Sequence, residues 1–277
     1  MEKKVIFLDI DGTLTEPGKN VPPASALTAI RRAQECGHQV WLCSGRNLGM
    51  ISPLLGYSFD GVIASSGGYI LAGDEVIYDC PIPEKEKDDA MRILQEKGIF
   101  RTIEGRDDSY TDEGLKDFLR SHASEGANSE FLRWREQVES ALNILPMSQY
   151  KGEAAYKIVV MSDSMEKMQS LKRELPDMFQ VCIQEPDGFG FVNGELVNKA
   201  FDKGRAVERV CDYLGLSVSA SIGFGDSMND LEMIEKVGYS VCMANGAKAL
   251  KEIADLVCPS VTEDGMYQAF EKLGLMG

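Results

Sequence analysis

The sequence is poor in the residues that build imidazole and thiol sites. It has two histidines, His38 and His122, and no CxxC pair among seven cysteines. A zinc site, which takes clustered Cys and His ligands, and a thioredoxin-like centre are therefore disfavoured. We interpret the thiols as mostly buried groups in a reducing cytosol. The cysteines are Cys36, Cys43, Cys80, Cys182, Cys211, Cys242 and Cys258.

Positive charge and long apolar runs are also scarce. Lysine and arginine number 29 against 44 acidic residues, which gives a formal charge of −15. Such a surface repels nucleic acid and anionic membranes, so neither is an expected partner, and an anionic ligand must be held by local positive charge. No apolar run approaches the ~20 residues of a membrane span. We therefore expect a cytoplasmic monomer or small homo-oligomer.

What the sequence does have is an alternation of strand and helix patterns at both ends. Residues 5–8 form a continuous apolar run, typical of a strand covered on both faces. Residues 22–37 predict a helix with Ala26, Ala29, Ile30 and Ala33 on its buried face. This alternation predicts an α/β fold with a doubly wound, parallel, Rossmann-like sheet. Further strands are expected within 38–46, 61–68, 219–226 and 239–246, and a helix within 227–238.

The middle of the chain has a different pattern. Residues 81–98 predict a charged amphipathic helix, and 154–163 and 180–194 predict strands of a separate sheet. We expect a core formed by 1–82 and 188–277 and a smaller inserted α/β domain at 83–187. Residues 107–155 are too irregular to assign. The glycine-rich stretch at 188–194 predicts a turn at the edge of the insert, because no strand and helix frame it as a dinucleotide loop.

Polar side chains follow three predicted strands directly. Asp9 follows VIFL, Ser44 follows VWLC, and Asp226 follows SIGFG. The carboxyl ends of parallel strands meet at one edge of a sheet, where ligands bind, so we expect the three to converge. Carboxylates brought together in this way favour a bound cation, and all-oxygen ligation indicates Mg²⁺. Asp230, four residues after Asp226, can share a helix face with it, although acids there can also simply cap the helix.

Four ordered motifs resemble those of haloacid dehalogenase-like phosphatases. They are DIDGT at 9–13, CSGR at 43–46, DKG at 202–204 and GDSMND at 225–230. The long gap between the second and third motifs resembles the Cof-like members, which carry an α/β cap domain there. Similar stretches at 241–255 and 262–266 extend the resemblance over the whole core. The resemblance implies hydrolysis of small phosphate monoesters, such as sugar phosphates or phosphorylated cofactors.

The resemblance also implies a role for each motif residue. Asp9 would be the nucleophile that forms an aspartyl-phosphate, and Asp11 would be the general acid and base. Mg²⁺ would be held by Asp9, the backbone carbonyl of Asp11 and Asp226, with Asp230 completing the acidic site. Phosphoryl oxygens would be bound by the remaining motif residues. These are Ser44, Gly45, Arg46, Lys203 and Asn229.

Three points stay open in this assignment. Arg46 is a plausible anion contact, but it could equally close a helix or pair with a surface acid. Ser66 stands where the Cof-like pattern usually has Asn, which puts any substrate contact of that Asn in doubt. The two histidines belong to no nucleophile motif and no GxSxG occurs, so a Ser/His/Asp hydrolase is improbable and both are bystanders.

Other functions would use similar residues. A receiver-type signalling domain also forms a phospho-aspartate, but here the nucleophile lies on the first strand and a domain-sized insert precedes the lysine. A mutase would return the phosphoryl group to a sugar instead of water. A catalytically silent metal-binding module is disfavoured because all four motifs hold competent residues.

Lys203 is the cation that we expect to meet phosphate. Residues 202–215 predict a helix capped by Asp202, with Lys203 in its first turn. A cation there opposes the helix dipole, so local stability does not explain its position, whereas phosphate binding does. We therefore expect Lys203→Met to leave folding stability unchanged or slightly raised. The expected buried face comprises Val207, Val210, Cys211 and Leu214.

Overall fold

The computed structural model describes residues 2–115, 117–118, 144–184 and 191–277. It divides into two compact units. The first comprises 1–46, 51–79 and 201–277, and the second comprises 47–50 and 80–200. Across the described ranges, no helix combines the length and apolar character that a membrane span requires.

The core of the first unit is an eight-stranded sheet in the order β14-β13-β12-β1-β2-β3-β4-β5. Neighbouring strands from β14 through β3 run parallel, whereas β4 and β5 extend the sheet as an antiparallel hairpin. The central strand β1 pairs with both β12 and β2. The strands are β1 (Val5–Leu8), β2 (Gln39–Cys43), β3 (Gly61–Ala64), β4 (Tyr69–Ala72), β5 (Glu75–Asp79), β12 (Ser221–Gly225), β13 (Tyr239–Met243) and β14 (Leu256–Cys258).

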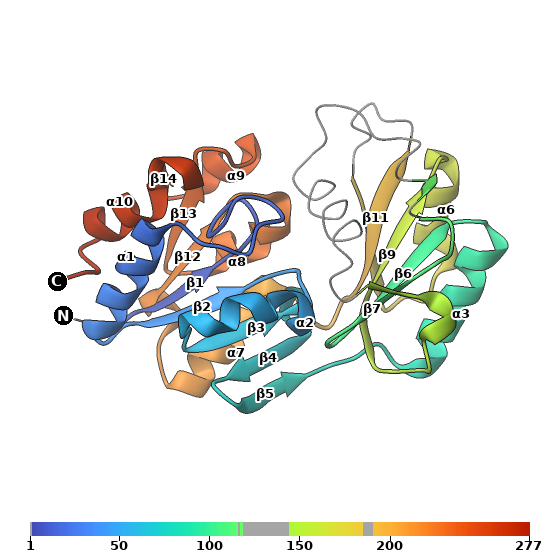
Figure 1. Cartoon of the computed structure of the whole chain (residues 1–277), viewed down its shortest axis with the longest axis horizontal. Coiled ribbons are helices and arrows are strands. Elements are labelled where there is room, and N and C mark those ends of the chain that lie inside the picture. The colour runs from blue at the N-terminus through green and yellow to red at the C-terminus, as the bar shows by residue number, and fades with distance from the viewer. Residues whose placement is uncertain (1, 116, 119–143, 185–190) are drawn as a thin grey trace. The chain divides into compact units, whose positions relative to one another are not determined.

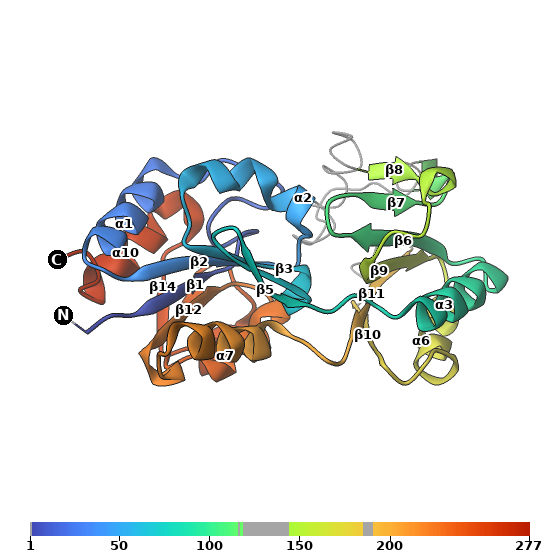
Figure 2. The same cartoon turned by 90° about the horizontal axis from the view of Figure 1, so that it is seen from below.

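Helices cover both faces of this sheet (Figures 1 and 2). Figure 2 shows α1 and α10 on one face and α7 on the other. The α7 face packs Val207 and Val210 against Val5, Phe7 and Trp41 of the sheet. This confirms the doubly wound α/β fold. The helices are α1 (Ala24–Glu35), α2 (Leu48–Ile51), α7 (Lys203–Leu214), α8 (Leu231–Lys236), α9 (Lys248–Ile253) and α10 (Gly265–Lys272).

Helices α1 and α7 follow the sequence patterns closely. The buried residues of α1 are the four predicted: Ala26, Ala29, Ile30 and Ala33. In α7, Val207, Val210 and Cys211 are buried and Leu214 is half-buried. The carboxylate of Asp202 caps α7 by accepting the backbone N–H of Arg205 at 2.7 Å. Gly215 ends α7 in the left-handed conformation, at φ 65°.

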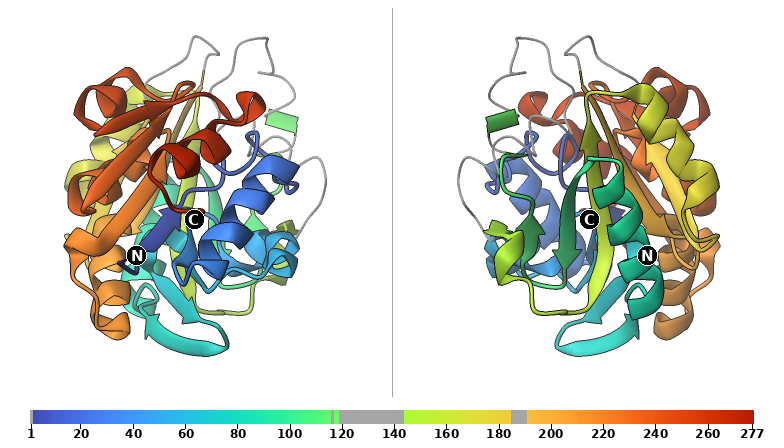
Figure 3. Two further views of the ribbon diagram at one scale, coloured as in Figure 1. Left: turned by 90° about the vertical axis from the view of Figure 1, so that its left-hand side faces the viewer. Right: turned by 90° about the vertical axis from the view of Figure 1, so that its right-hand side faces the viewer.

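The second unit is built on a six-stranded sheet in the order β10-β11-β9-β6-β7-β8. Helices α3 (Glu84–Glu96) and α6 (Met165–Glu174) lie over one face of it (Figure 3), where Leu94 and Leu171 join Ile103 and Ile158 in one apolar cluster. Strand β11 pairs with β9 and β10, so the boundary expected at 187 falls before a strand of this sheet. The strands are β6 (Phe100–Gly105), β7 (Ser109–Thr111), β8 (Ile144–Pro146), β9 (Ala155–Ser162), β10 (Phe179–Ile183) and β11 (Val192–Asn198).

The glycine-rich stretch and the cysteines can be compared with their predictions. Residues 192–194 belong to strand β11, whereas 188–190, where the turn is expected, lie outside the described residues. The seven cysteines form no disulfide, and four of them are buried, in agreement with the interpretation as mostly buried thiols. His38 is buried and accepts a backbone hydrogen bond from Lys4, and His122 lies outside the described residues.

Candidate active site

Three polar residues lie at the carboxyl ends of adjacent strands. Asp9 follows β1, Ser44 follows β2 and Asp226 follows β12, and the strand order places β1 between the other two. All three residues are at most 5% exposed. The parallel register that pairs Leu8 with Phe224 therefore produces the convergence that the sequence predicts.

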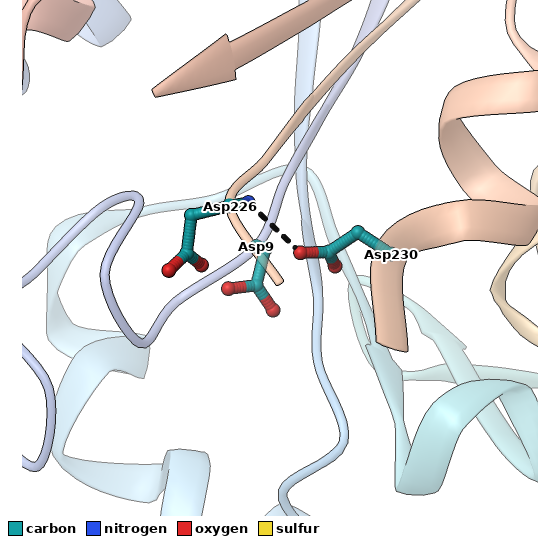
Figure 4. Close-up of side chains that lie close together, drawn as sticks. All are labelled: Asp9, Asp226 and Asp230. Atoms are coloured by element: carbon teal, nitrogen blue, oxygen red, sulfur yellow. Dashed lines mark hydrogen bonds between the residues drawn. The ribbon is translucent and has the colours of Figure 1, made fainter. Parts of the chain in front are cut away.

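Asp9, Asp226 and Asp230 form a buried acidic cluster. One carboxylate oxygen from each lies within 4.8 Å of the others. Figure 4 shows the carboxylates of Asp226 and Asp230 on either side of that of Asp9. Asp230 also accepts the backbone N–H groups of Asp226 and Ser227, at 3.0 and 3.1 Å. Its position is thus fixed by the turn that follows β12.

Lys203, the first residue of α7, lies against two of these acids. Its Nζ is 2.7 Å from Oδ1 of Asp9 and 2.5 Å from Oδ1 of Asp230. It also donates to Oδ1 of Asn229 at 3.4 Å, and Asn229 accepts from Ser227 at 2.7 Å. The side chain of Lys203 is completely buried, so its ammonium faces these acids instead of bulk solvent.

The charge of the cluster is only partly balanced. Burial raises the pKa of Asp9 to about 7, with repulsion from Asp230 adding to the effect and Lys203 opposing it. Burial and then repulsion from Asp9 and Asp230 raise the pKa of Asp226 to about 9. Burial alone would lower the pKa of Lys203, but attraction by Asp230 and Asp9 raises it well above its ordinary value. Lys203 therefore stays charged, and ionising Asp9 and Asp226 together is unfavourable without further positive charge.

These residues fit a divalent cation. Hard cations prefer oxygen ligands, and a cation beside buried carboxylates favours their ionised form. Asp9 and Asp226 offer such oxygens, and their raised pKa values mark the charge that a cation would offset. Asp230 belongs to the same cluster, but its two oxygens also hold Lys203 and the backbone amides, so it can support the site from behind.

Two side chains that the sequence analysis did not assign bind Asp226. Thr13 donates to its Oδ1 at 3.2 Å. Asn245, in the turn after β13, donates to the carbonyl of Gly12 at 2.9 Å and approaches Oδ2 of Asp226 at 3.5 Å. The sequence pattern that could have identified Asn245 is its place just after a strand of the parallel sheet, a place that it shares with Asp226.

Gly12 allows its loop to approach Asp226. Its φ is +84°, and a Cβ built there would lie 2.3 Å from Oδ2 of Asp226. A side chain at this position would therefore displace the carboxylate or the loop.

The structure places Asp11 and Arg46 together. Nε and Nη2 of Arg46 donate to the two carboxylate oxygens of Asp11, at 2.8 and 2.7 Å. The sequence analysis predicted phosphate binding for Arg46 and left a surface acid open as an alternative partner; the acid that it contacts in the structure is the buried Asp11. Arg46 lies against Asp11 because the loop after β1 also supplies two further acceptors for its guanidinium, Oδ1 of Asn20 and the backbone carbonyl of Lys19.

The loop after β2 is tightly held. Ser44 is 1% exposed, its Oγ accepts the backbone N–H of Arg46 at 3.1 Å, and Gly45 between them is buried. The backbone N–H groups of Ser65 and Ser66 donate to the carbonyls of Arg46 and Ser44. Both serines are left-handed, at φ 50° and 57°, which is uncommon for residues other than glycine. Asn tolerates this conformation better than Ser.

Comparison with known proteins decides the family. A family model described as haloacid dehalogenase-like hydrolase matches residues 6–270. The chain belongs to the haloacid dehalogenase-like hydrolase family. The resemblance of the four motifs is thereby confirmed, and membership of this hydrolase family decides against the receiver-type alternative.

Relatives of this haloacid dehalogenase-like hydrolase match it from end to end. The putative phosphatase YkrA of Bacillus subtilis is 28% identical over 100% of both chains. The 5-amino-6-(5-phospho-D-ribitylamino)uracil phosphatase YwtE of Bacillus subtilis is 27% identical over 98% of each. A solved haloacid dehalogenase-like hydrolase from B. subtilis superposes with a TM-score of 0.79 at 24% identity, covering 98% of this chain and 99% of that one.

Proposed function

We propose that this protein is a Mg²⁺-dependent phosphatase that hydrolyses small phosphate monoesters through a phosphorylated Asp9. The observation that carries the proposal is the buried cluster in which Asp9 lies 2.7 Å from the ammonium of Lys203 and beside Asp226. This cluster supports the proposal, in which Asp9 is the nucleophile, Lys203 is the cation that meets phosphate and Asp226 is a metal ligand.

Each residue has a defined part in this reaction. A carboxylate oxygen of Asp9 bonds to phosphorus while the ester P–O bond breaks, and Asp11 gives its proton to the departing oxygen. Asp11 then takes a proton from the water that attacks the phosphorylated Asp9, which releases inorganic phosphate and restores both acids. Lys203 and the Ser44 loop hold the phosphoryl oxygens and stabilise the charge that develops on them.

Asp9, the carbonyl of Asp11 and Asp226 would hold Mg²⁺, with Asp230 behind them. The ion supplies positive charge that offsets the buried carboxylates and the phosphoryl group. Asn229 orients Lys203, to which it is hydrogen-bonded.

The substrate class rests on the relatives. YwtE is named for a phosphorylated ribityl compound, and YkrA is named as a putative phosphatase. We propose sugar phosphates or phosphorylated cofactors as substrates. A formal charge of −15 is unfavourable for nucleic acid. We propose a cytoplasmic location. We also propose that the protein is a monomer or small homo-oligomer, and light scattering would measure this oligomeric state.

Phosphate release from a panel of small esters tests the function. With Mg²⁺ present, at least one ester should turn over, and chelation should stop it. Asp9→Asn should remove both turnover and the acid-stable mass increase of a phosphorylated aspartate, whereas Asp11→Asn should slow both steps. Asp74→Asn, an exposed acid in the β4–β5 turn, is the matched control. Phosphate transferred to a sugar instead of water would favour the mutase.

A further inference from the structure

The guanidinium of Arg46 donates hydrogen bonds to the carboxylate of Asp11 and to Lys19 and Asn20 of the loop after β1. Arg46 lies in the turn after β2, is 1% exposed, and grips both oxygens of Asp11 with Nε and Nη2. Oδ1 of Asp11 also accepts the backbone N–H of Gly18 at 2.9 Å. Such a forked pair fixes the plane of the carboxylate as well as its position.

The guanidinium is itself held from the other side. Nη1 donates to Oδ1 of Asn20 at 2.6 Å, and Nη2 donates to the carbonyl of Lys19 at 3.2 Å. The backbone of Arg46 is pinned at its N–H by Ser44 and at its carbonyl by Ser65. The backbone and the guanidinium of Arg46 are thus both held by hydrogen bonds. The position of the turn after β2 therefore determines where the guanidinium holds the carboxylate of Asp11.

We propose that Arg46 is a positioning residue for Asp11, not a phosphate ligand. The inference rests on the proposed function, in which Asp11 moves the proton of the leaving group. Without the fork, the carboxylate of Asp11 can rotate, so proton transfer suffers while phosphate binding does not. The role differs from that of Lys203, whose ammonium lies against Asp9 itself.

Leaving-group dependence distinguishes the two roles. An alkyl phosphate needs a proton on its departing oxygen, whereas 4-nitrophenyl phosphate leaves readily without one. Arg46→Met should lower kcat/KM for the alkyl ester by about 10- to 100-fold, a part of the usual contribution of general acid–base catalysis. For the aryl ester kcat/KM should stay within about threefold, because kcat/KM reports the steps up to and including departure of the leaving group, and 4-nitrophenolate departs without being protonated. An equal loss on both esters would overturn the proposal.

A double-mutant cycle makes the test independent of general damage. In an Asp11→Asn background, Arg46→Met should cost nothing more on the alkyl ester, because the group it positions is already disabled. A further loss there would assign Arg46 to phosphate. Arg46→Lys, which keeps the charge without the fork, should show the same leaving-group preference and serves if the Met variant does not fold.

The chain offers a matched control in the second unit. Arg101 grips Asp112 with Nε and Nη2 at 2.8 and 2.7 Å, the same geometry as the Arg46 pair. Arg101→Met removes an equivalent ion pair and should leave the ratio of the two esters unchanged. A changed ratio would show that loss of any such pair alters selectivity, which would overturn the proposal.

A crystal structure of Arg46→Met supplies a result that does not depend on activity. The carboxylate of Asp11 should take another rotamer or two rotamers in that variant. An unchanged Asp11 carboxylate would overturn the positioning role. If the wild-type protein turned over neither ester with Mg²⁺, the proposed function would fail. The position of Asp11 in the crystal structure of Arg46→Met would still show whether Arg46 positions that carboxylate.

Discussion

Replacing Lys203 by Met should weaken both the fold and the reaction. The side chain of Lys203 is fully buried, and its ammonium contacts Asp9 and Asp230, which are themselves buried. Removing one partner of a buried ion pair leaves a charge without compensation and typically costs about 3–5 kcal/mol. The structure thus reverses the expectation of unchanged stability, which considered only the helix dipole.

The size of the effect can be expressed as a melting temperature. At about 2–4 °C per kcal/mol for a domain of ~150–250 residues, Tm should fall by about 6–20 °C. On the best substrate, kcat/KM should fall at least a hundredfold, because a cation at the developing phosphoryl charge is worth ~3 kcal/mol. Calorimetry in chelator and steady-state kinetics with Mg²⁺ measure the two effects separately.

Two controls sharpen this prediction. Lys199→Met should change stability by less than about 0.5 kcal/mol, since Lys199 is exposed and its Nζ donates to a backbone carbonyl, that of Asp177, at the surface. The double variant Lys203→Met/Asp230→Asn removes one charge of each sign and should recover part of the lost Tm. An unchanged Tm for Lys203→Met, or a larger loss for Lys199→Met, would refute the reasoning.

Three other measurements follow from the acidic cluster. The folded pKa values of Asp9 and Asp226, about 7 and about 9, lie above the ordinary 3.8, so the folded protein keeps protons that the unfolded chain releases. In chelator, thermal scans should therefore show stability falling as pH rises from about 4 through about 9, and Mg²⁺ should flatten the slope; a stability that rises over this range contradicts the assigned signs. Asn245→Leu should weaken Mg²⁺ binding by about tenfold in calorimetry, because it removes the contact that aligns Asp226 and the Gly12 carbonyl; unchanged binding would exclude that role. Gly12→Ala should abolish turnover, whereas Gly73→Ala, also at positive φ but with nothing within 4 Å of the built Cβ, should retain it; equal losses would show that backbone strain and not the clash is responsible.

The part of the site that the sequence predicts is the part set by the sheet. Asp9, Ser44 and Asp226 each follow an apolar strand, and parallel strands end at a common edge, so their convergence needs no further information. Likewise, hydrophobic periodicity was sufficient to predict the buried face of α1, because the apolar residues of this helix recur at helical spacing.

The contacts that the sequence could not supply depend on loops and on distant packing. Arg46 meets Asp11 because residues 18–20 fold back as a further set of acceptors, and no periodic pattern marks that loop. Strand β5 escaped prediction because it lies at the sheet edge, with largely exposed side chains and only three consecutive apolar residues, whereas β4 (YILA) is a continuous apolar run that the sequence analysis did not assign. The burial of Lys203 follows from how α7 packs, which its own sequence does not report.

The pairing of β1 with β12 has a consequence for the order of folding during synthesis. Val5 lies opposite Ser221, so the central strand of the core waits for more than two hundred residues before one of its neighbours exists. The second unit, in contrast, draws almost all of its residues from the continuous segment 80–200. Because distant pairings close slowly and domains fold as units, we expect strands β6, β9, β10 and β11 of this segment to become protease-resistant on the ribosome while residues 5–8 remain accessible. Stalled nascent chains ending near residue 240, in which β11 has emerged while β12 is still inside the ribosomal exit tunnel, should show this difference, and protection of both regions at that length would contradict it.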